Sequence, residues 1–396
     1  MKTIVVTGAT GLLGSAFLFE LMARPAGDVG RIVVLGGRGE FSALHERLAA
    51  ALRDHGLDYL ELGEQDVTRL MERVEGMQMR LDEPGVGLSD EDLARLAQIE
   101  IDVFVHIAGL TTFKKDDQAA ADCKRVNVDG LDNLLGVCAG LKIGRFVHLG
   151  SAYSAGRVQG HCQPDDDDPE GQFHNPYQRS KADGERMVRA WAQARSDMEL
   201  IVVRPATIGG RLLTAPRAHV TKFDVFLAWA KGMMRLKGMF AGGLRTSHGK
   251  RIDIPMRLTM HPTAGLNIVP TDWVAKCLVV TALDDDLRHC SYHLANHAST
   301  PHNMYVRQII DAVGIGGVTF QDHRPTDMSM LESVYHERLG WVFADYVEHP
   351  ELSFDVASQA ELEEKAGVRC PPVDAQAFAD LLGYGHERHY GLDLDR

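Results

Sequence analysis

The residues that most constrain the fold stand at the start of the chain, where an apolar run, spaced glycines and a helical pattern follow one another. Residues 3–7 have the length of a buried strand, and helical spacing begins at Leu12. Glycines at such a junction allow a tight turn and the close approach of a pyrophosphate, and the helix start offers free N–H groups to phosphate. A purely structural glycine turn is the alternative. We expect a dinucleotide site formed by Thr7, Gly8, Thr10, Gly11, Leu12, Leu13 and Gly14.

Strand-like and helix-like segments alternate through the first two hundred residues. Short apolar runs have the length of buried parallel strands, and the longer segments between them have helical spacing. This alternation predicts a Rossmann-type, doubly wound parallel α/β sheet with helices on both faces. The expected strands are residues 3–7, 31–35, 101–107, 146–149 and 200–203, and the expected helices are residues 12–23, 41–53, 116–141, 176–195 and 271–283.

Composition and charge exclude several classes of protein. The 396 residues include 42 Lys and Arg against 55 Asp and Glu, a formal charge of −13, which argues against nucleic acid as a partner because phosphate binding needs a basic face. Six cysteines without a C-x-x-C pair indicate no zinc knuckle or redox pair and fit a reducing cytoplasm. No apolar run approaches the ~18 residues of a membrane span, and signal-peptide features are absent. We expect a cytoplasmic protein without stable membrane insertion.

The end of the second expected strand indicates which dinucleotide binds. An NAD site usually places an acidic side chain there for the ribose 2′-hydroxyl, whereas an arginine suits the 2′-phosphate of NADP. The chain reads Leu35-Gly36-Gly37-Arg38, with no Asp or Glu from residue 31 to residue 39. Arg38 therefore favours NADPH as the cofactor. The alternative is that Arg38 is an ordinary surface residue and that Glu40 binds the ribose.

A tyrosine and a lysine four residues apart form the clearest candidate for chemistry. Asn175 and Pro176 precede them as a helix N-cap and a proline at the first helical position, so Tyr177 and Lys181 share one helix face. A phenol has an unperturbed pKa near 10 and is a poor acid at neutral pH. We expect the Lys181 ammonium and the positive end of the helix to lower the pKa of Tyr177.

Ser151 stands at the position from which it can join this pair. It follows the expected strand at residues 146–149, and in open α/β sheets the ligand crevice lies at the carboxyl ends of the strands. Ser151 can therefore hydrogen-bond the same substrate oxygen as Tyr177.

Several blocks of the chain together resemble one family. They are residues 7–14, 106–113, 127–130, 151–156, 175–185, 203–207 and 266–272, with looser matches at Tyr346, Phe354-Asp355 and Pro371-Pro372. Together they resemble the extended short-chain dehydrogenase/reductases, in the branch of the fatty acyl-CoA reductases and the thioester-reductase domains of carboxylic acid reductases (male-sterility-type NAD-binding domains). The resemblance spans about residues 1–283.

This resemblance implies roles for individual residues. Ser151, Tyr177 and Lys181 would form the catalytic triad, and Asn127 would hold a water that relays protons through Lys181. One departure concerns the adenine site, where the chain has Gly76-Met77-Gln78 in place of the usual Gly-Asp. The cofactor groove would also be lined by Ala108, Gly109, Pro205 and Thr207, besides Tyr177 and Lys181.

The function that the resemblance implies is an NADPH-dependent reduction of an acyl thioester, carried on coenzyme A or on a carrier protein, to an aldehyde. A second reduction to the alcohol stays open. The alternative enzyme uses the same triad on a ketone, a secondary alcohol or a nucleotide-sugar. A non-catalytic NADP-sensing regulator is disfavoured because such proteins usually lose the tyrosine or the lysine, and Tyr177 and Lys181 are both present.

Domain boundaries follow from a change of pattern after residue 208. We expect residues 1–208, with 266–283 returning to them, to form the NADP-binding Rossmann domain, and residues 209–265 and 284–396 to form a smaller, mainly helical substrate lobe. Residues 211–257 hold ten lysines and arginines against two acidic residues, a net charge of +8. We expect this basic stretch to face the substrate entrance, where it would suit the phosphates of coenzyme A or an acidic carrier protein. The alternatives are a solvated surface balanced by acidic loops elsewhere and a basic amphipathic segment at residues 223–240 that binds a membrane surface.

The eighteen histidines give no convincing metal site. His289, His293 and His297 recur every four residues, which would need a helix to bring them together, yet their segment has the pattern of a strand. We therefore expect no metal. His106 and His148 lie inside expected strands, where we interpret them as core histidines with satisfied hydrogen bonds.

Overall fold

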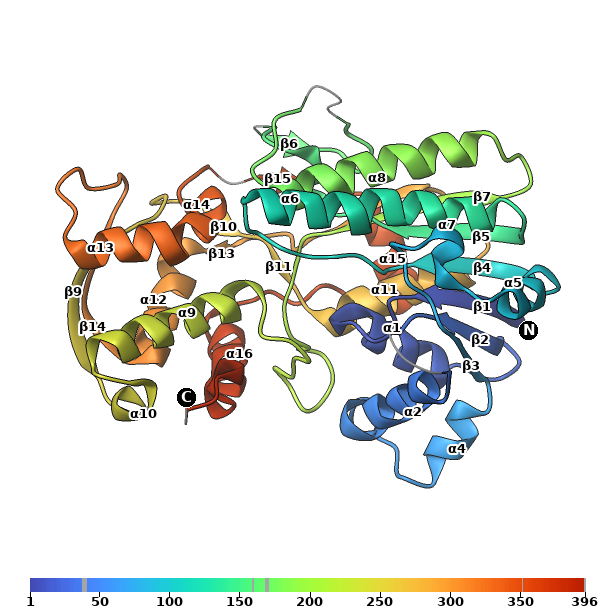
Figure 1. Ribbon diagram of the computed structural model, residues 1–396, viewed down its shortest axis with the longest axis horizontal. Helices are drawn as coiled ribbons and strands as arrows, with labels where there is room; N and C mark the ends of the chain where they lie inside the picture. The colour runs from blue at the N-terminus through green and yellow to red at the C-terminus, as the bar shows by residue number, and fades with distance from the viewer. Residues whose placement is uncertain (38–40, 159, 168–170, 351, 395–396) are drawn as a thin grey trace.

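The computed structural model describes residues 1–37, 41–158, 160–167, 171–350 and 352–394, and its largest element is a seven-stranded sheet. The strand order is β12-β7-β5-β4-β1-β2-β3, and all neighbours are parallel. This sheet, drawn on the right of Figure 1, confirms the Rossmann-type doubly wound fold. Its strands are β1 (Lys2–Thr7), β2 (Val29–Leu35), β3 (Val74–Met77), β4 (Glu100–His106), β5 (Lys142–Leu149), β7 (Glu199–Pro205) and β12 (Ser291–Leu294).

Helices cover both faces of this sheet, and the strands are accordingly apolar on both sides. In β1, Ile4 and Val6 face one hydrophobic core while Val5 faces the other, as the alternation along a strand requires. The first face carries α1 (Leu12–Ala23), α2 (Phe41–Ala51), α3 (Leu57–Leu60), α4 (Asp66–Met71), α11 (Thr271–Leu283) and α15 (Gln359–Ala366). The second face carries α5 (Asp90–Ala97), α7 (Gly130–Cys138) and α8 (Pro176–Gln193).

Two expected helices are interrupted. The segment 116–141 consists of α6 (Asp117–Cys123), a π-helical turn η3 (Lys124–Asp129) and α7, and a second π-helical turn, η1 (Leu52–Gly56), follows α2. Such π turns insert an extra residue into a helix. Short 3₁₀ turns also occur at η2 (Pro84–Gly87), η4 (Ala152–Ala155) and η6 (His389–Gly391).

The expected boundary at residue 284 needs a correction. Strand β12, which we expected in the lobe, pairs with β7 and forms the edge of the main sheet. Phe354, Leu362 and Cys370 also belong to the main core, so α15 packs on the nucleotide-binding part. All four residues of β12 are buried. Its sequence alternates polar and apolar side chains, a pattern typical of a strand with one exposed face, so it did not predict that β12 is buried on both faces.

The remaining elements form a second body with its own core, which we call the lobe (residues 209–268, 300–350 and 373–392; left of Figure 1). Most of its regular structure is helical, as expected, and a parallel pair of strands forms its outer side. No helix within the described ranges is long and apolar enough to cross a membrane. The helices are α9 (Val225–Phe240), α10 (Leu244–Ser247), α12 (His302–Val313), α13 (Met330–Tyr335), the π turn η5 (His336–Gly340), α14 (Trp341–Val347) and α16 (Ala375–Glu387).

Short strand pairs complete the lobe and its junction with the main sheet. The outer pair is β9 (Ile252–Thr259) with β14 (Ile315–Gln321). The other pairs are β8 (Thr207–Ile208) with β11 (Ile268–Val269), β10 (Gly265–Leu266) with β13 (Thr300–Pro301), and β6 (His161–Cys162) with β15 (Ser353–Phe354).

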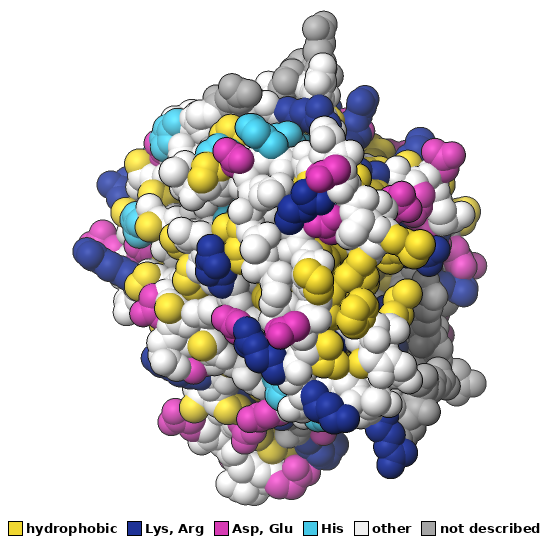
Figure 2. Space-filling model, turned by 90° about the vertical axis from the view of Figure 1, so that its left-hand side faces the viewer, with side chains coloured by type: hydrophobic (Ala, Val, Ile, Leu, Met, Phe, Trp, Pro, Cys, Tyr) yellow, Lys and Arg dark blue, Asp and Glu magenta, His cyan; other side chains and the backbone are white. Residues whose placement is uncertain are grey.

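The basic stretch at residues 211–257 does not form one surface at the substrate entrance, which corrects that expectation. Arg211 and Lys237 are buried, and Arg257 forms ion pairs with Glu332 and Asp327. On the side of the lobe in Figure 2, basic side chains lie interspersed with acidic ones. Lys222 lies at the cavity described below.

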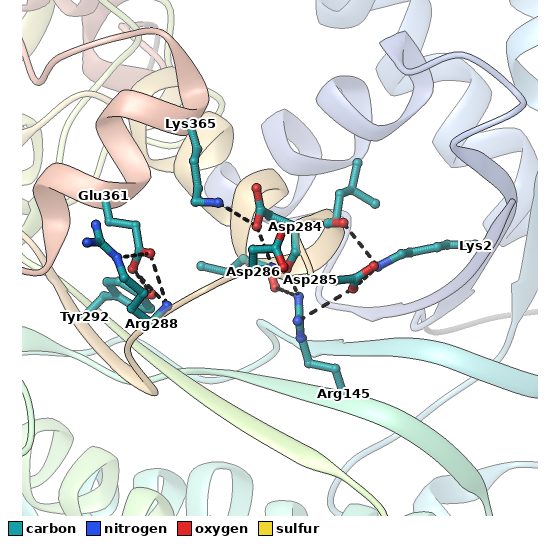
Figure 3. Close-up of polar contacts among 11 residues, drawn as sticks. Lys2, Arg145, Asp284, Asp285, Asp286, Arg288, Tyr292, Glu361 and Lys365 are labelled. Atoms are coloured by element: carbon teal, nitrogen blue, oxygen red, sulfur yellow. Dashed lines mark hydrogen bonds and ion pairs between the residues drawn. The ribbon is translucent and has the colours of Figure 1, made fainter.

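The loop after α11 is fastened to the main sheet by charged side chains (Figure 3). The buried Arg145 of β5 donates hydrogen bonds to the carbonyl oxygens of Thr281 (2.9 Å) and Asp284 (2.6 Å), at the C-terminal end of α11. Lys365 of α15 pairs with the Asp284 carboxylate at 2.8 Å. Arg145 therefore satisfies helix-end carbonyls that have no partner within the helix.

Replacing Arg145 by alanine should destabilise the fold by about 2–4 kcal/mol, because two carbonyl oxygens would lose a charged donor at a largely buried site. Urea unfolding measures the change. Lys365→Ala is the matched control, since it removes a partly exposed ion pair at the same loop and should cost less than about 1 kcal/mol. Equal costs for the two variants would contradict the role given to Arg145.

Candidate active site

A cavity of about 490 Å³ lies at the carboxyl ends of the central strands, between the main sheet and the lobe. It brings together most of the residues expected from the sequence, although these come from five separate segments of the chain. Its lining includes Gly8, Thr10, Gly11, Leu12, Leu13, Gly14, Ala108, Gly109, Ser151, Tyr177, Lys181, Pro205 and Thr207.

The glycine loop has the geometry that a dinucleotide requires. Gly8 has a φ of +78°, and a Cβ atom there would lie 2.7 Å from the Ala108 nitrogen. A Cβ on Gly14 would overlap the carbonyl oxygen of Gly8. No side chain in the described part of the chain caps the start of α1 at Gly11, so the first N–H groups of the helix are open to the cavity. The loop therefore fits a pyrophosphate.

Thr7 supports this loop from behind and lies outside the cavity lining. Its hydroxyl accepts hydrogen bonds from the backbone nitrogens of Ile107 and Ala108, each at 3.2 Å, and pairs with Nδ1 of His106 at 2.8 Å. Thr7 thus ties the end of β1 to the end of β4, where Ala108 meets Gly8.

Ser151 and Tyr177 converge on one point of the cavity. Ser151 follows β5 and is 4% exposed. Tyr177 lies in the first turn of α8, which Asn175 caps by accepting the backbone N–H of Gln178 at 3.0 Å. The Tyr177 hydroxyl is within hydrogen-bonding reach of the hydroxyls of Ser151 and Thr111. Thr111 was not among the expected site residues, although it lies in the sequence block at residues 106–113.

The pKa of Tyr177 differs from expectation. Burial raises it, and the hydrogen bonds with Thr111 and Ser151 only oppose that effect. We expected the Lys181 ammonium to lower the pKa, but Nζ of Lys181 donates to the carbonyl oxygen of Leu149 at 2.6 Å. Burial also lowers the pKa of Lys181 to about 8, against the attraction of Glu185. Desolvation dominates at both groups because the site is enclosed.

Asn127 lies in the π turn η3 and outside the cavity lining. Its Oδ1 accepts the backbone N–H of Leu110 at 2.7 Å, and its Nδ2 donates to the Leu110 carbonyl and the Ser180 hydroxyl, each at 2.9 Å. Asn127 therefore clamps the segment that follows β4. The proton relay that the resemblance implies for it stays a prediction.

The lobe side of the cavity has an aromatic wall, of which the sequence blocks contain only Phe113, Tyr153 and Tyr346. The ring of Trp229 stacks on Phe343 with centroids 4.9 Å apart. Trp229 and Phe343 come from distant segments, and the one signal for this pair was the position of Trp229 in the expected substrate lobe. The wall consists of Phe113, Tyr153, Phe226, Trp229, Tyr305, Phe343 and Tyr346.

The residues expected to read the ribose, Arg38 and Glu40, lie outside the described residues. The neighbouring Gly37 has a φ of +96°, and a Cβ there would lie 3.2 Å from a guanidinium nitrogen of Arg47 on α2. Arg47 is thus a second basic residue at the end of β2, and its helical position gave no signal in the sequence.

The histidines need one correction. His106 is satisfied as expected, but neither ring nitrogen of the buried His148 has a hydrogen-bond partner among the described residues. The two rings stack with centroids 5.7 Å apart, and burial lowers the pKa of both. Each is therefore neutral at physiological pH, and His148 contributes packing rather than a polar link.

A group of metal-ligand type does occur elsewhere, where His174, Asp345 and His349 offer atoms within 4.8 Å of one another. Lys115 pairs with the same Asp345 carboxylate at 2.5 Å, and His174 lies 3.4 Å from it. An ammonium on the carboxylate opposes a cation, so we interpret this group as an ion-pair link between the lobe and the start of α8.

Comparison with known proteins agrees with this geometry. The family described as male sterility protein matches residues 6–278. A hybrid PKS-NRPS synthetase of Macrophomina phaseolina is 32% identical over 248 residues, covering 61% of this chain and 5% of that protein. Fatty acyl-CoA reductase 1 of Xenopus laevis is 24% identical over 264 residues, covering 59% of this chain and 49% of that protein. The chain thus spans at most about half the length of these curated relatives.

Among solved structures, the terminal R domain from the myxalamid PKS-NRPS biosynthetic pathway superposes with a TM-score of 0.72 at 20% identity. The superposition covers 98% of this chain and 92% of that domain. At this identity the likeness concerns the fold, including the parts of the lobe after residue 278 that the family match does not cover.

Proposed function

The chain belongs to the male sterility protein family, as an NAD(P)-dependent oxidoreductase of the extended short-chain type, and from this membership we propose that it is an NADPH-dependent reductase of acyl thioesters. The observation that carries the proposal is the continuous cavity, in which the glycine loop, the group Ser151, Tyr177 and Lys181, and an aromatic wall follow one another. The likeness to proteins named as fatty acyl-CoA reductases supports a thioester as the substrate.

The site residues have separate roles in this reaction. Bound NADPH would supply a hydride to the thioester carbonyl carbon. Ser151 and Tyr177 then donate hydrogen bonds to the carbonyl oxygen as negative charge develops on it. Burial keeps the proton on the Tyr177 phenol at neutral pH, which suits a donor. The carbon–sulfur bond breaks, the sulfur leaves as a thiol, and the product is an aldehyde. Each turnover consumes one hydride and one proton.

Lys181 orients this arrangement. An ammonium has three N–H donors, and the Leu149 carbonyl takes one of them. The other two would be available to hold hydroxyl groups of a bound cofactor. The positive charge also favours the developing oxyanion nearby.

The function is tested by following NADPH oxidation with a panel of acyl-CoAs and the matched free aldehydes, with the aldehyde and alcohol products trapped and identified. We expect NADPH to be oxidised in the presence of acyl-CoA thioesters, with release of the free thiol of coenzyme A. Turnover of aldehydes or ketones without any turnover of thioesters would favour the alternative, a reductase of simple carbonyl compounds. Formation of alcohol would show that the second reduction occurs.

The preference for NADPH over NADH should depend on the arginines at the end of β2. Arg38→Ala and Arg47→Ala should each weaken NADPH binding roughly tenfold to a hundredfold and leave NADH binding almost unchanged, because a charged hydrogen bond to phosphate contributes about 1.5–3 kcal/mol. Fluorescence titration of both cofactors measures the ratio. Arg53→Ala is the control, since that exposed arginine pairs with Glu64. Equal loss of affinity for NADPH and NADH would show that other residues bind the 2′-phosphate of the ribose.

A further inference from the structure

The hydroxyl of Tyr346 lies where the lobe meets the catalytic helix. Tyr346 belongs to α14 and lines the cavity. Its ring makes edge-on contacts with Phe113 and Tyr153, at centroid distances of 5.6 and 5.5 Å. Its oxygen is within hydrogen-bonding distance of Nδ2 of Asn175 (2.9 Å) and Nε2 of Gln178 (3.1 Å), both at the start of α8.

The direction of these two hydrogen bonds is fixed by the backbone. Oδ1 of Asn175 accepts the N–H of Gln178, and Oε1 of Gln178 accepts the N–H of His174 at 3.1 Å. A backbone N–H can only donate, so the oxygen of each amide is identified and its nitrogen must face Tyr346. Both amides therefore donate, and the Tyr346 oxygen accepts two hydrogen bonds.

The proton of Tyr346 consequently has to go elsewhere. Among the residues that the structure describes, no group is placed to accept it. The other tyrosines of the aromatic wall differ, because the Tyr153 hydroxyl pairs with Thr207 (3.1 Å) and the Tyr305 hydroxyl with His302 (3.1 Å). A phenol O–H in an enclosed site needs an acceptor, and the open direction at Tyr346 is the cavity.

In the proposed reaction the reacting carbonyl oxygen already has Ser151 and Tyr177 as donors, so Tyr346 is left for another oxygen. The ring of Phe113 makes edge-on contacts with both Tyr177, at 5.9 Å, and Tyr346, so it packs against both phenol rings. Tyr346 therefore faces the lobe side of the cavity, where aromatic side chains predominate and Lys222 and Asp224 are the charged residues of the lining. A hydroxyl donor fixed in direction within a largely aromatic wall selects for a polar atom of a ligand at that point.

We propose that Tyr346 donates a hydrogen bond to an oxygen on the acyl group, so that the preferred substrates are acyl thioesters with a hydroxyl or keto oxygen near the thioester carbon. This inference rests on the proposed function, because it takes the acyl group to occupy the lobe side of the cavity. Tyr346 would then determine substrate selectivity in addition to the group Ser151, Tyr177 and Lys181.

The test compares 3-hydroxybutanoyl-CoA with butanoyl-CoA, which differ in one oxygen. We expect kcat/KM of the wild-type protein to favour the hydroxyacyl substrate at least about tenfold, since a buried donor left unpaired rejects the analogue that lacks the acceptor. Tyr346→Phe should lower kcat/KM for the hydroxyacyl thioester, should not lower it for butanoyl-CoA because the unpaired donor is gone, and should bring the ratio of the two near one.

Tyr153→Phe is the matched control, because it removes a cavity hydroxyl that already pairs with Thr207. It should change kcat/KM of both substrates by the same factor. An equal loss on both substrates in Tyr346→Phe would overturn the proposal, since Tyr346 would then act only through Asn175 and Gln178. Melting temperature and NADPH affinity show whether the start of α8 remains intact.

The pair 3-hydroxybutanal and butanal separates this inference from the proposed function. These aldehydes carry the same oxygen without the thioester. If neither thioester reacts, the proposed function fails. The ratio of kcat/KM for 3-hydroxybutanal to that for butanal still shows whether Tyr346 contacts the extra oxygen. A ratio that Tyr346→Phe abolishes supports the contact to the acyl oxygen, and a ratio that it leaves unchanged overturns it.

Discussion

Replacing Tyr177 by phenylalanine should lower kcat at least about 100-fold, the scale of general acid catalysis, and leave NADPH affinity within about twofold of wild type. The variant lacks the proton donor to the carbonyl oxygen, while its ring keeps the edge-on contact with Phe113. Steady-state turnover with an acyl-CoA and a cofactor titration measure the two effects separately.

A second Tyr→Phe substitution, at a tyrosine away from the cavity, is the control for Tyr177→Phe. Tyr390 is buried in the lobe core, and its hydroxyl donates to the Leu382 carbonyl at 3.3 Å, away from the cavity. Tyr390→Phe should lower stability slightly and leave kcat unchanged. Near-normal turnover of Tyr177→Phe would show that another group donates the proton, and Thr111, within reach of the same hydroxyl, would be the first to examine.

The part of the site that depends on local sequence was predictable. The glycine loop needs only the neighbouring strand and helix, and the structure has both at the expected residues. Likewise, Asn175 and Pro176 fix the start of α8, and the four-residue spacing then places Tyr177 and Lys181 on one face. Such features follow from turn chemistry and helix geometry within about one segment of chain.

The features that depend on tertiary packing were not predictable. Phe113, Trp229 and Tyr346 meet only because the lobe folds back over the ends of β4 and β5. The direction of the Tyr177 pKa shift was also wrong, because the spacing of two residues does not reveal how strongly a site is desolvated. Strand β12 was assigned to the lobe since its order in the sheet depends on a partner almost ninety residues earlier, as the pairing of Ser291 with Val202 shows.

The second prediction with a large effect concerns the charge of Lys181, whose pKa is lowered by burial. Because burial lowers its pKa from 10.5 to about 8, the ammonium that the site requires is lost as pH rises through about 8. We therefore expect kcat/KM to fall with a slope of one proton above that pH. Lys181→Met should reduce kcat roughly 10²–10⁴-fold at pH 7, since it removes both the charge and its donors. A wild-type profile that stays flat to pH 9.5 would contradict a required ammonium.

The burial of Lys181 also predicts how the free energy of unfolding depends on pH, which can be measured without an activity assay. Between pH 8 and 10.5 the unfolded chain keeps the Lys181 proton while the folded chain has released it, so the unfolded state binds more protons. The contribution of Lys181 to the free energy of unfolding therefore rises with pH over this window, by up to about 3 kcal/mol. Lys181→Met has no such group, and the difference between its unfolding free energy and that of wild type should shift in favour of wild type from pH 8 to 10.5. Urea unfolding of both proteins across this range measures the shift. A constant difference would mean that Lys181 is as well solvated in the folded chain as in the unfolded one, and the enclosed site would then need another explanation.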